Sequence, residues 1–368
     1  MAADSTYRAA AIGRTGAGNY GHGLHQPFVD LDNIAFVAIA DPDEEGRREQ
    51  MEATGVQKGY TDFRAMLEKE KPDLVTVGPR WTDCHLEMVL ACIDAGAHVY
   101  CEKPMTWNLE EGDRIVAAAA AAGRKVAVAH QGVYLPVVQG VKAMIADGRL
   151  GELRALYAHG KQARRGGGAD MIVLGTHAFN TMRCLSGDVA WMSAPVMAAG
   201  HELTTADIAE PTELVGPVAG DCINSYFAFA NGVAGSFDSR RKGATGGALY
   251  GIEVVGSEGR IWLRGGGDDT MIYPYPDANP ADLQQQWQPL EEFAGAHLQG
   301  DGNRLAILDL ITCIEQDRKP ISSAEDAVAA LEMILGAYEA QITGGRVTMP
   351  MTRRQHPLVA WPEGAYGG

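Results

Sequence analysis

Residues 8–23 read RAAAIGRTGAGNYGHG, an apolar strand that runs directly into a glycine-rich loop. The next strand, expected at 34–40, ends in Asp41. In dinucleotide-binding proteins the glycine loop meets the diphosphate, and an acid roughly 20 residues on bonds the ribose hydroxyls. A glycine pattern alone is weak evidence, because a flexible turn also produces one. Strand, glycines, helix, strand and acid in this order predict a Rossmann-type site.

Two registers of the pattern G-x-G-x-x-G compete within the loop. Gly16, Gly18 and Gly21 match it literally, whereas Gly13, Thr15 and Gly18 match its position better, because Gly13 directly follows the strand. In the second register the Cβ of Thr15 crowds the pyrophosphate unless Gly16 takes over the close approach. In either register we expect backbone N–H groups and a helix N-terminus to face the diphosphate.

The residues after the second strand bear on the choice of cofactor. An aspartate at position 41 accepts bonds from both ribose hydroxyls and repels a 2′-phosphate, so NAD is favoured. Arg47 and Arg48 lie just beyond, which keeps NADP as the alternative.

The first 130 residues alternate strand and helix signals, which predicts a parallel sheet covered by helices. We expect strands at 8–12, 34–40, 73–77, 97–101 and 125–129. The apolar period of 3.6 residues predicts helices at 43–54, 62–70, 82–95 and 108–122. Three of them end near glycines that suit helix stops, namely Gly55, Gly96 and Gly123.

After His130 the pattern becomes rich in β-strands. We expect helices at 137–147, about 170–185, 303–316 and 324–342, with Ser322 and Glu325 as a capping box for the last. Strands are expected at 153–159, 189–198, 221–230, 233–239, 250–255 and 259–263, with loops at 164–168 and 265–267. Turn signals between the later strands favour antiparallel hairpins. The predicted domains are a Rossmann domain, 1–130, and an α+β domain for substrate binding and oligomerisation, 131–368.

Composition excludes several classes of protein. The 368 residues carry a formal charge of -16, which argues against binding to nucleic acid or an anionic membrane. No apolar run reaches the ~18 residues needed to span a bilayer. The six cysteines lack C-x-x-C spacing, so we expect neither zinc or another metal nor a disulfide framework. The interpretation is a reduced, soluble, cytoplasmic protein.

Several stretches together resemble the Gfo/Idh/MocA family of nicotinamide-dependent oxidoreductases, named for glucose–fructose oxidoreductase and inositol dehydrogenase. They are the glycine loop, ADPDEEGR, HLEMVLACIDAGAHVYCEKPM, AHQ and GGGADMIVLGTHAFNTMRCLSG. The resemblance covers most of the chain, is strongest over 8–185, and has E-K-P as its most specific element. It implies a Rossmann domain followed by a domain with an open-faced, largely antiparallel sheet. It also implies sugar or polyol substrates and a homo-oligomer, a dimer or tetramer.

The resemblance implies catalytic roles for Lys103 and His177. Lys103 would contact the substrate oxygen beside the nicotinamide, and a cis bond before Pro104 would turn it into the cleft. His85 and Gln131 would line the cofactor cleft. The full cofactor set expected is Gly13, Arg14, Thr15, Gly16, Gly18, Asn19, Tyr20, Asp41, Pro79, Arg80, Trp81, His85, Glu102, Lys103 and Gln131.

The chain departs from the family where its members carry carboxylates. Val173 stands four residues before His177, where an aspartate is common, and Asn180 replaces an aspartate three residues after it. Asp170 lies seven residues before the histidine; on an α-helix it shares the histidine's face, about 10 Å away along the axis. Asp170 opens the expected helix, so an N-cap role competes with a substrate role. The residues Arg80, Trp81 and Thr82 replace a common Thr-Pro-Asn.

Further residues are candidates for substrate binding. Lys161, Arg164 and Arg165 are either solvated loop charges or ligands for hydroxyls or an acidic group. Trp81 and Tyr134 either pack or stack on a sugar. The expected substrate set is Asp170, Arg164, Arg165, Tyr134, Asn180 and Trp81.

Oxidation of a secondary alcohol needs a base for the hydroxyl proton, and histidine suits that role because its ordinary pKa lies near neutrality. A lysine can hold the same oxygen and stabilise negative charge. Which of the two takes the proton stays open. The leading hypothesis is an NAD-dependent dehydrogenase of a sugar, glycoside or polyol. The alternatives are a glycoside-cleaving enzyme with transient oxidation by bound NAD and a non-catalytic cofactor-binding regulator.

Overall fold

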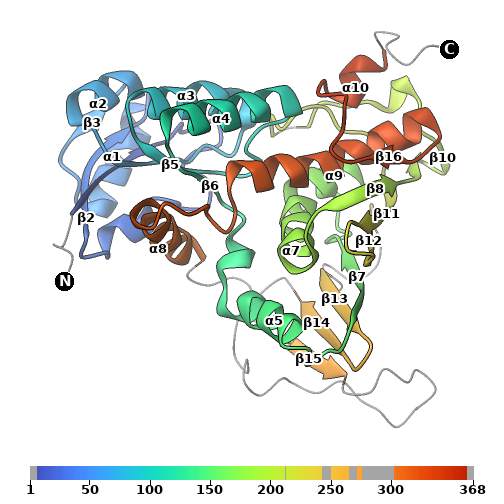
Figure 1. The fold of residues 1–368 in the computed structure, drawn as a ribbon. Helices are drawn as coiled ribbons and strands as arrows, with labels where there is room; N and C mark the ends of the chain where they lie inside the picture. Colours follow the sequence, from blue (N-terminus) through green and yellow to red (C-terminus); the bar gives the residue numbers. More distant parts are fainter. Residues whose placement is uncertain (1–5, 212, 243–249, 265–271, 276–301, 363–368) are drawn as a thin grey trace. The chain divides into compact units, whose positions relative to one another are not determined.

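The structure is a computed structural model that describes residues 6–211, 213–242, 250–264, 272–275 and 302–362. The chain forms two compact units (Figure 1). Unit 1 contains residues 1–129, 212–216 and 303–328, and unit 2 contains 130–211, 217–302 and 329–368. These units and the predicted domains divide the chain alike near residue 130 and differ for the two later segments of unit 1. The roles assigned to the domains stay predictions.

Unit 1 is built on a six-stranded sheet whose strand order is β3-β2-β1-β4-β5-β6. Every neighbouring pair in it is parallel. The strands β4 and β5 are buried along their whole length, as expected for a parallel sheet covered on both faces. The predicted Rossmann architecture is confirmed. The strands are β1 (Tyr7–Ile12), β2 (Ile34–Ala40), β3 (Gly59–Tyr60), β4 (Leu74–Val77), β5 (His98–Cys101) and β6 (Val126–Val128).

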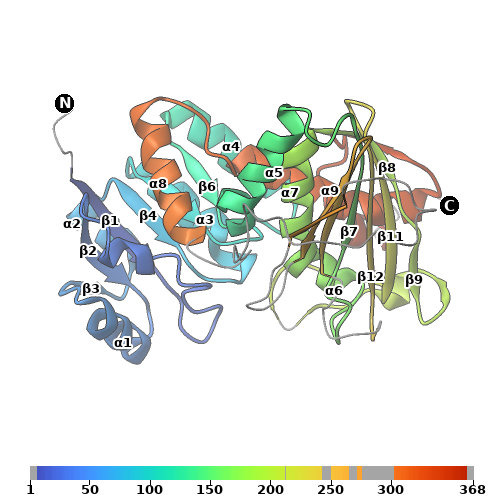
Figure 2. The ribbon, with the colours of Figure 1, turned by 90° about the horizontal axis from the view of Figure 1, so that it is seen from below.

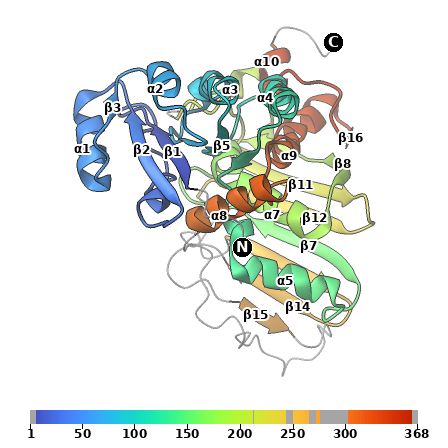
Figure 3. The same cartoon turned by 60° about the vertical axis from the view of Figure 1, so that its left-hand side comes forward.

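Two helices of unit 1, α1 and α4, begin and end where the sequence places caps. In α1, the Asp43 carboxylate accepts the N–H of Gly46 and Gly55 closes the helix with a φ of 75°. In α4, Asn108 and Gly123 do the same. Figure 3 shows α1 beside β2 and β3. The helices are α1 (Glu44–Thr54), α2 (Phe63–Glu70), α3 (His85–Asp94), α4 (Leu109–Ala122) and α8 (Gly302–Glu315).

Two expectations for unit 1 need correction. The helix expected at 82–95 starts as a separate 3-10 turn, η2 (Thr82–Cys84), whereas its end near Gly96 is confirmed, because α3 stops at Asp94 and Gly96 follows with a φ of 87°. Between β1 and β2 there is no α-helix among the described residues, only the 3-10 turn η1 (Gln26–Val29). The glycine loop therefore does not lead into a helix N-terminus.

Later segments of the chain complete unit 1 through specific contacts. The N–H and hydroxyl of Thr82 both donate to the Leu214 carbonyl, at 2.8 and 2.9 Å. At the start of α8, the hydroxyl of Tyr100 donates to Asn303 at 2.8 Å. The expected α-helical capping box was placed one residue too early. Ser323 and Asp326, not Ser322 and Glu325, bond reciprocally before α9 (Ala324–Thr343).

Unit 2 contains a ten-stranded sheet with the path β10-β9-β11-β12-β7-β13-β14-β15; β8 pairs with β11 and β16. Among the described strands, β12 and β7 are parallel and the other pairs antiparallel. The expected strand 189–198 breaks into two around Pro195, and the loop expected at 265–267 lies outside the described residues. The strands are β7 (Leu153–His159), β8 (Val189–Ser193), β9 (Val196–Ala198), β10 (His201–Glu202), β11 (Cys222–Phe229), β12 (Ala234–Arg240), β13 (Gly251–Gly256), β14 (Arg260–Arg264), β15 (Ile272–Tyr275) and β16 (Val347–Thr348).

One face of this sheet is covered by α7 (Thr176–Ser186) and α9 (Figure 2). Phe179 of α7 packs edge-on against Phe227 and Phe237, and all three side chains are fully buried. On the opposite face Tyr157 and Tyr226 stay exposed. The predicted open-faced, largely antiparallel sheet is thus confirmed. The remaining helical segments are η3 (Gln131–Tyr134), α5 (Pro136–Ala146), α6 (Gly168–Asp170), η5 (Thr205–Asp207) and α10 (Pro357–Ala360). Within the part of the chain that the structure describes, no helix is long and apolar enough to cross a bilayer.

A buried histidine in unit 2 makes stability depend on pH. His356 accepts the Leu358 N–H at the start of α10, and burial lowers its pKa to about 3. Between the ordinary pKa of about 6.5 and that value, only the unfolded chain binds the proton, so stability falls as pH falls. The variant His356→Asn keeps an acceptor at the cap. From pH 7 to pH 4, we expect the wild type to lose at least about 1.4 kcal/mol more unfolding free energy than this variant. Urea unfolding at each pH measures the free energy. An equal loss of unfolding free energy in both proteins between pH 7 and pH 4 would contradict the assignment.

Candidate active site

The glycine loop closes on itself after β1. Arg14 and Asn19 form a small antiparallel bridge, with N–H to carbonyl distances of 3.1 and 2.9 Å. The loop then crosses the carboxyl end of the sheet, where the Arg80 N–H donates to the Gly18 carbonyl at 3.2 Å. Most of the loop's glycines thus serve packing against protein rather than leaving room for a ligand.

The space beside each glycine separates these roles. A Cβ added to Gly13 would lie 2.2 Å from the Tyr20 ring, one on Gly18 would lie 2.5 Å from the Arg80 nitrogen, and one on Gly21 would lie 2.3 Å from the Gly78 oxygen. Gly16, with a φ of 81°, has no atom within 4 Å of that position. It is therefore the glycine at which a diphosphate can approach the backbone. Burial, with the Asp41 charge nearby, raises the pKa of Tyr20.

The acid at the end of β2 is fully buried and bonded within the protein. The Asp41 carboxylate accepts the Thr15 hydroxyl at 2.7 Å and the N–H groups of Thr15 and Asp43. The side chain of Arg47 binds the Asp41 backbone carbonyl at 2.6 Å, while Arg48 pairs with two glutamates of α1.

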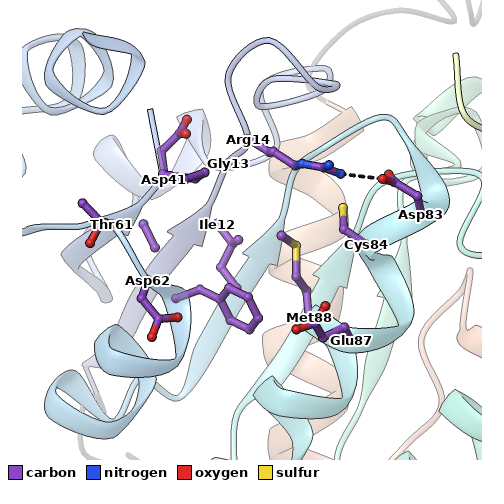
Figure 4. A pocket seen from close by; sticks show the side chains of 13 residues that line it. Ile12, Gly13, Arg14, Asp41, Thr61, Asp62, Asp83, Cys84, Glu87 and Met88 are labelled. Carbon is purple, nitrogen blue, oxygen red and sulfur yellow. Dashed lines mark hydrogen bonds and ion pairs between the residues drawn. The ribbon is translucent and has the colours of Figure 1, made fainter. Parts of the chain in front are cut away.

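A pocket of about 330 Å³ opens at the carboxyl ends of β1 and β2 (Figure 4). Arg14 crosses its rim to Asp83, with 2.7 Å between Nη1 and Oδ2. Apolar side chains and backbone form much of its wall, as an aromatic ring requires. The lining residues are Ile12, Gly13, Arg14, Ala40, Asp41, Pro42, Thr61, Asp62, Phe63, Asp83, Cys84, Glu87 and Met88.

The Glu-Lys-Pro element follows β5 directly, and the Lys103–Pro104 peptide is cis, as expected. Glu102 is fully buried, and Lys103 is 5% exposed. Glu102 accepts the Lys103 N–H at 2.6 Å and the His22 N–H at 2.9 Å, and it also contacts Nδ1 of His22. Burial alone raises the pKa of Glu102, but the bond and charge of His22 and the charge and N–H of Lys103 hold it below its ordinary value.

His85 lies beneath this element and is fully buried. Its Nδ1 is 2.9 Å from the Met105 carbonyl oxygen, and its Nε2 is 2.6 Å from that of Pro79. The imidazole therefore joins the turn after Lys103 to the loop after β4. Arg80 and Trp81, which follow in that loop, are half-buried. The roles of these residues toward a cofactor stay predictions.

In unit 2, Asp170 is the one acid of the expected substrate set, and its side chain is 1% exposed. Its Oδ2 accepts the Ser239 hydroxyl at 2.6 Å and the Gln162 N–H at 3.3 Å. Its Oδ1 is buried and, among the described residues, has no hydrogen-bond partner. A Cβ on Gly160 would lie 2.2 Å from Oδ2. The N-cap alternative for Asp170 is wrong, because α6 begins after Gly167 and the carboxylate caps no helix.

The helix expected at 170–185 is interrupted by a π-helical turn, η4 (Met171–Gly175). Its bonds span five residues instead of four, so Asp170 and His177 are not related by two regular α-helical turns. Such turns occur frequently at functional sites. Val173, in place of the family's aspartate, lies within this turn and is half-buried.

His177 follows the π turn and is half-buried. The ring of His130 stands edge-on to it, with 5.7 Å between centroids, and Nε2 of His130 lies 2.8 Å from the Thr176 hydroxyl. Asn180 is buried on α7, and Tyr134 is buried at the end of η3. Unit 2 thus brings His130, which precedes η3, against the start of α7, where His177 lies.

The basic residues before Asp170 differ in placement. Arg164 is exposed and Arg165 is half-buried. Nζ of Lys161 lies 5.6 Å from the centre of the Tyr250 ring, and the charge of Asp170, added to burial, raises the pKa of that tyrosine. Gln131 packs against Gly302, because a Cβ added to Gly302 would lie 2.6 Å from the Cβ of Gln131.

Sequence reasoning missed three residues that contact the candidate site residues or their chain neighbours, namely His22, His130 and Ser239. Each bonds a residue distant in sequence: His22 contacts Glu102, His130 contacts Thr176 and Ser239 contacts Asp170. The one signal for His22 in the sequence is its place in the glycine-rich stretch, and its spacing from other residues matches no motif. Among the described residues, no group of three or more His, Cys, Asp or Glu side chains is arranged to hold a metal.

A parallel sheet with a glycine loop, a buried acid and a pocket at its carboxyl edge defines a Rossmann-type dinucleotide-binding protein. Residues 11–130 match the sequence model of the "Oxidoreductase family, NAD-binding Rossmann fold", and residues 138–262 match that of the "GFO/IDH/MocA C-terminal domain". The chain belongs to the Gfo/Idh/MocA family of oxidoreductases, as its motifs predict.

Similar proteins include dehydrogenases of polyols and sugars. Myo-inositol 2-dehydrogenase of Thermotoga maritima is 27% identical over 272 residues, which cover 71% of this chain and 77% of that one. D-apiose dehydrogenase of Paraburkholderia graminis is 22% identical over 361 residues, or 94% and 91%. An Agrobacterium radiobacter oxidoreductase crystallised with NAD+, L-tartaric acid and magnesium shares the fold, with a TM-score of 0.73 and 18% identity over 94% of this chain and 98% of that one.

Proposed function

We propose that this protein is an NAD-dependent dehydrogenase that oxidises a secondary hydroxyl of a sugar, glycoside or polyol. The observation that carries the proposal is the Glu102–Lys103–Pro104 element. It presents a lysine two residues after the end of β5, an inner strand of the parallel sheet, at the carboxyl edge where such sheets bind ligands. The relatives named as dehydrogenases of myo-inositol and D-apiose support the substrate class.

The residues of unit 1 fit a nicotinamide dinucleotide. The open backbone at Gly16 suits a diphosphate, and the pocket beside Asp41 has room and apolar walls for an adenine. Tyr20, Arg14 and the segment 79–81 complete the cofactor set that we propose. When bound, the nicotinamide ring accepts the hydride from the alcohol carbon.

The chain's own residues handle the proton and the substrate oxygen. We assign Lys103 to hydrogen-bond that oxygen and to stabilise its developing negative charge. Glu102 places a buried negative charge beside Lys103 inside unit 1 and accepts the N–H groups of Lys103 and His22. His177 is the proposed base, since an imidazole titrates near neutrality. Asp170, with one carboxylate oxygen unbonded by described residues, is the proposed acceptor for a substrate hydroxyl.

The choice of NAD over NADP rests on the charges around Asp41. A 2′-phosphate would meet this carboxylate, while Arg47 and Arg48 are already bonded to Asp41, Glu45 and Glu52. With Asp41→Asn, we expect the ratio of NADPH to NADH dissociation constants to fall about tenfold, as loss of one close like charge implies. Fluorescence titration of both reduced cofactors measures it. Asp32→Asn, at an exposed site, is the control. An unchanged ratio in Asp41→Asn would remove Asp41 from cofactor selection.

The proposed function is tested with sugars, polyols and glycosides, each supplied with NAD and with NADP. Reduced nicotinamide is followed by absorbance. The proposal expects NADH to accumulate with at least one carbohydrate or polyol, and faster with NAD than with NADP. Binding of NADH without reduction of NAD by any carbohydrate at any pH would favour a non-catalytic cofactor-binding protein instead.

A further inference from the structure

Three donors of the protein already bond the Asp41 carboxylate, which is closed to solvent. Two carboxylate oxygens offer about four lone-pair positions. The Thr15 hydroxyl takes one at 2.7 Å, the Asp43 N–H takes one at 3.0 Å, and the Thr15 N–H lies 3.2 and 3.1 Å from the two oxygens. The side chain is 0% exposed. A ribose that bonds Asp41 must therefore displace donors that belong to the protein.

Two features of the fold hold Thr15 beside Asp41. The Arg14–Asn19 bridge closes the loop around it. On α1, a Cβ at Gly46 would lie 2.0 Å from the Thr15 hydroxyl oxygen and 2.6 Å from its Cβ, so only a glycine there admits the threonine. Thr15 also stands at the middle-glycine position of the register that starts at Gly13. The position that conventionally approaches the diphosphate instead carries a donor aimed at the ribose acid.

We infer that Thr15 determines cofactor affinity by competing with the ribose hydroxyls for Asp41. This inference rests on the proposed function, because it requires a dinucleotide at this site. Without cofactor, the Thr15 hydroxyl and N–H hold the carboxylate; with cofactor, the ribose hydroxyls replace the Thr15 hydroxyl. The free energy of the hydrogen bond from the Thr15 hydroxyl to Asp41 therefore reduces the binding free energy of the dinucleotide.

The variant Thr15→Val tests this competition, since valine keeps the shape against Gly46 and removes the hydroxyl. A hydrogen bond to a charged group typically contributes enough that its loss should tighten NADH binding about tenfold. Thr15→Ser restores the hydroxyl and should bind NADH as the wild type does. Thr54→Val is the matched control, because its hydroxyl donates within α1 to the Gln50 carbonyl and does not reach Asp41. Dissociation constants come from fluorescence titration of the full chain with NADH.

NADPH serves as the second probe. Its 2′-phosphate blocks the ribose bond to Asp41, so Thr15→Val should tighten NADH binding and leave NADPH binding unchanged. Equal tightening of both would mean that the loop had merely loosened, and it would overturn the inference. So would NADH binding by Thr15→Val that is equal to or weaker than wild type. If neither the wild type nor Thr15→Val binds NADH at millimolar concentration, the proposed function fails as well. If the wild type binds NADH and Thr15→Val binds it with the same affinity, only the role of Thr15 is rejected.

Discussion

Replacement of Lys103 by alanine should reduce the turnover number about 10³-fold while leaving the dissociation constant of NADH within about twofold of the wild type. Loss of a group that stabilises charge on the reacting oxygen lowers turnover by 10² to 10³, and loss of proton transfer by 10² to 10⁴. The Glu102 carboxylate accepts the Lys103 backbone N–H, which alanine retains. Steady-state kinetics with the best substrate of the panel and NADH titration provide the two measurements.

Lys69→Ala is the control for this experiment, because Lys69 is exposed on α2 of the same unit. Its turnover should equal that of the wild type. A turnover number of Lys103→Ala within a few-fold of the wild-type value would contradict the catalytic assignment of Lys103. Loss of NADH binding in parallel with turnover would make Lys103 a cofactor ligand instead.

Replacement of His177 by alanine should lower turnover about 10²-fold or more, since a positioned base contributes 10² to 10⁴. The partner ring of His130 and the Thr176 hydroxyl keep their mutual contact in this variant. If the imidazole moves the hydroxyl proton, added imidazole should restore part of the lost rate, and the substrate's KM should change less than the turnover number.

His201→Ala is the matched control, because His201 is an exposed histidine on the same unit. Its kinetics should be unchanged. Loss of rate in His177→Ala that no concentration of imidazole recovers, together with a large rise in KM, would assign His177 to substrate binding. Lys103 would then be the proton acceptor.

Local signals were sufficient for most of the fold. The helices α1 and α4 begin at Asp43 and Asn108 because these side chains accept early N–H groups, and Gly55 and Gly123 end them with positive φ. Such capping acts over a few residues and can therefore be read from the sequence. The turn signal between β11 and β12 predicted their antiparallel pairing for the same reason, since a tight turn also involves only a few residues.

The glycine loop illustrates where local patterns fail. The sequence predicted a helix after it, but the loop forms the Arg14–Asn19 bridge and packs over β4 and β5. This packing depends on Gly78 and Glu102, far along the chain. The π turn before His177 escaped prediction as well, because α and π turns share one sequence pattern and differ by a single bond step.

The groups of the candidate site were proposed from the sequence, whereas their hydrogen bonds were not. Motif resemblance pointed to Lys103 and His177, and the spacing from the glycine loop pointed to Asp41. The partners of these motifs, His22 for Glu102 and Ser239 for Asp170, emerge only when the sheet brings distant segments together. Thr15 was considered only as a residue that could crowd a diphosphate, and its bond to Asp41 was not predicted.

The central claim is that the protein removes hydride from a carbohydrate or polyol hydroxyl and passes it to NAD. The ratio of NADH formed to carbonyl product formed, measured with the best substrate of the panel, tests it most directly. A dehydrogenase gives one NADH for each carbonyl. Product from a cleaved glycoside with no net NADH would contradict the claim and identify an enzyme that returns the hydride within each turnover.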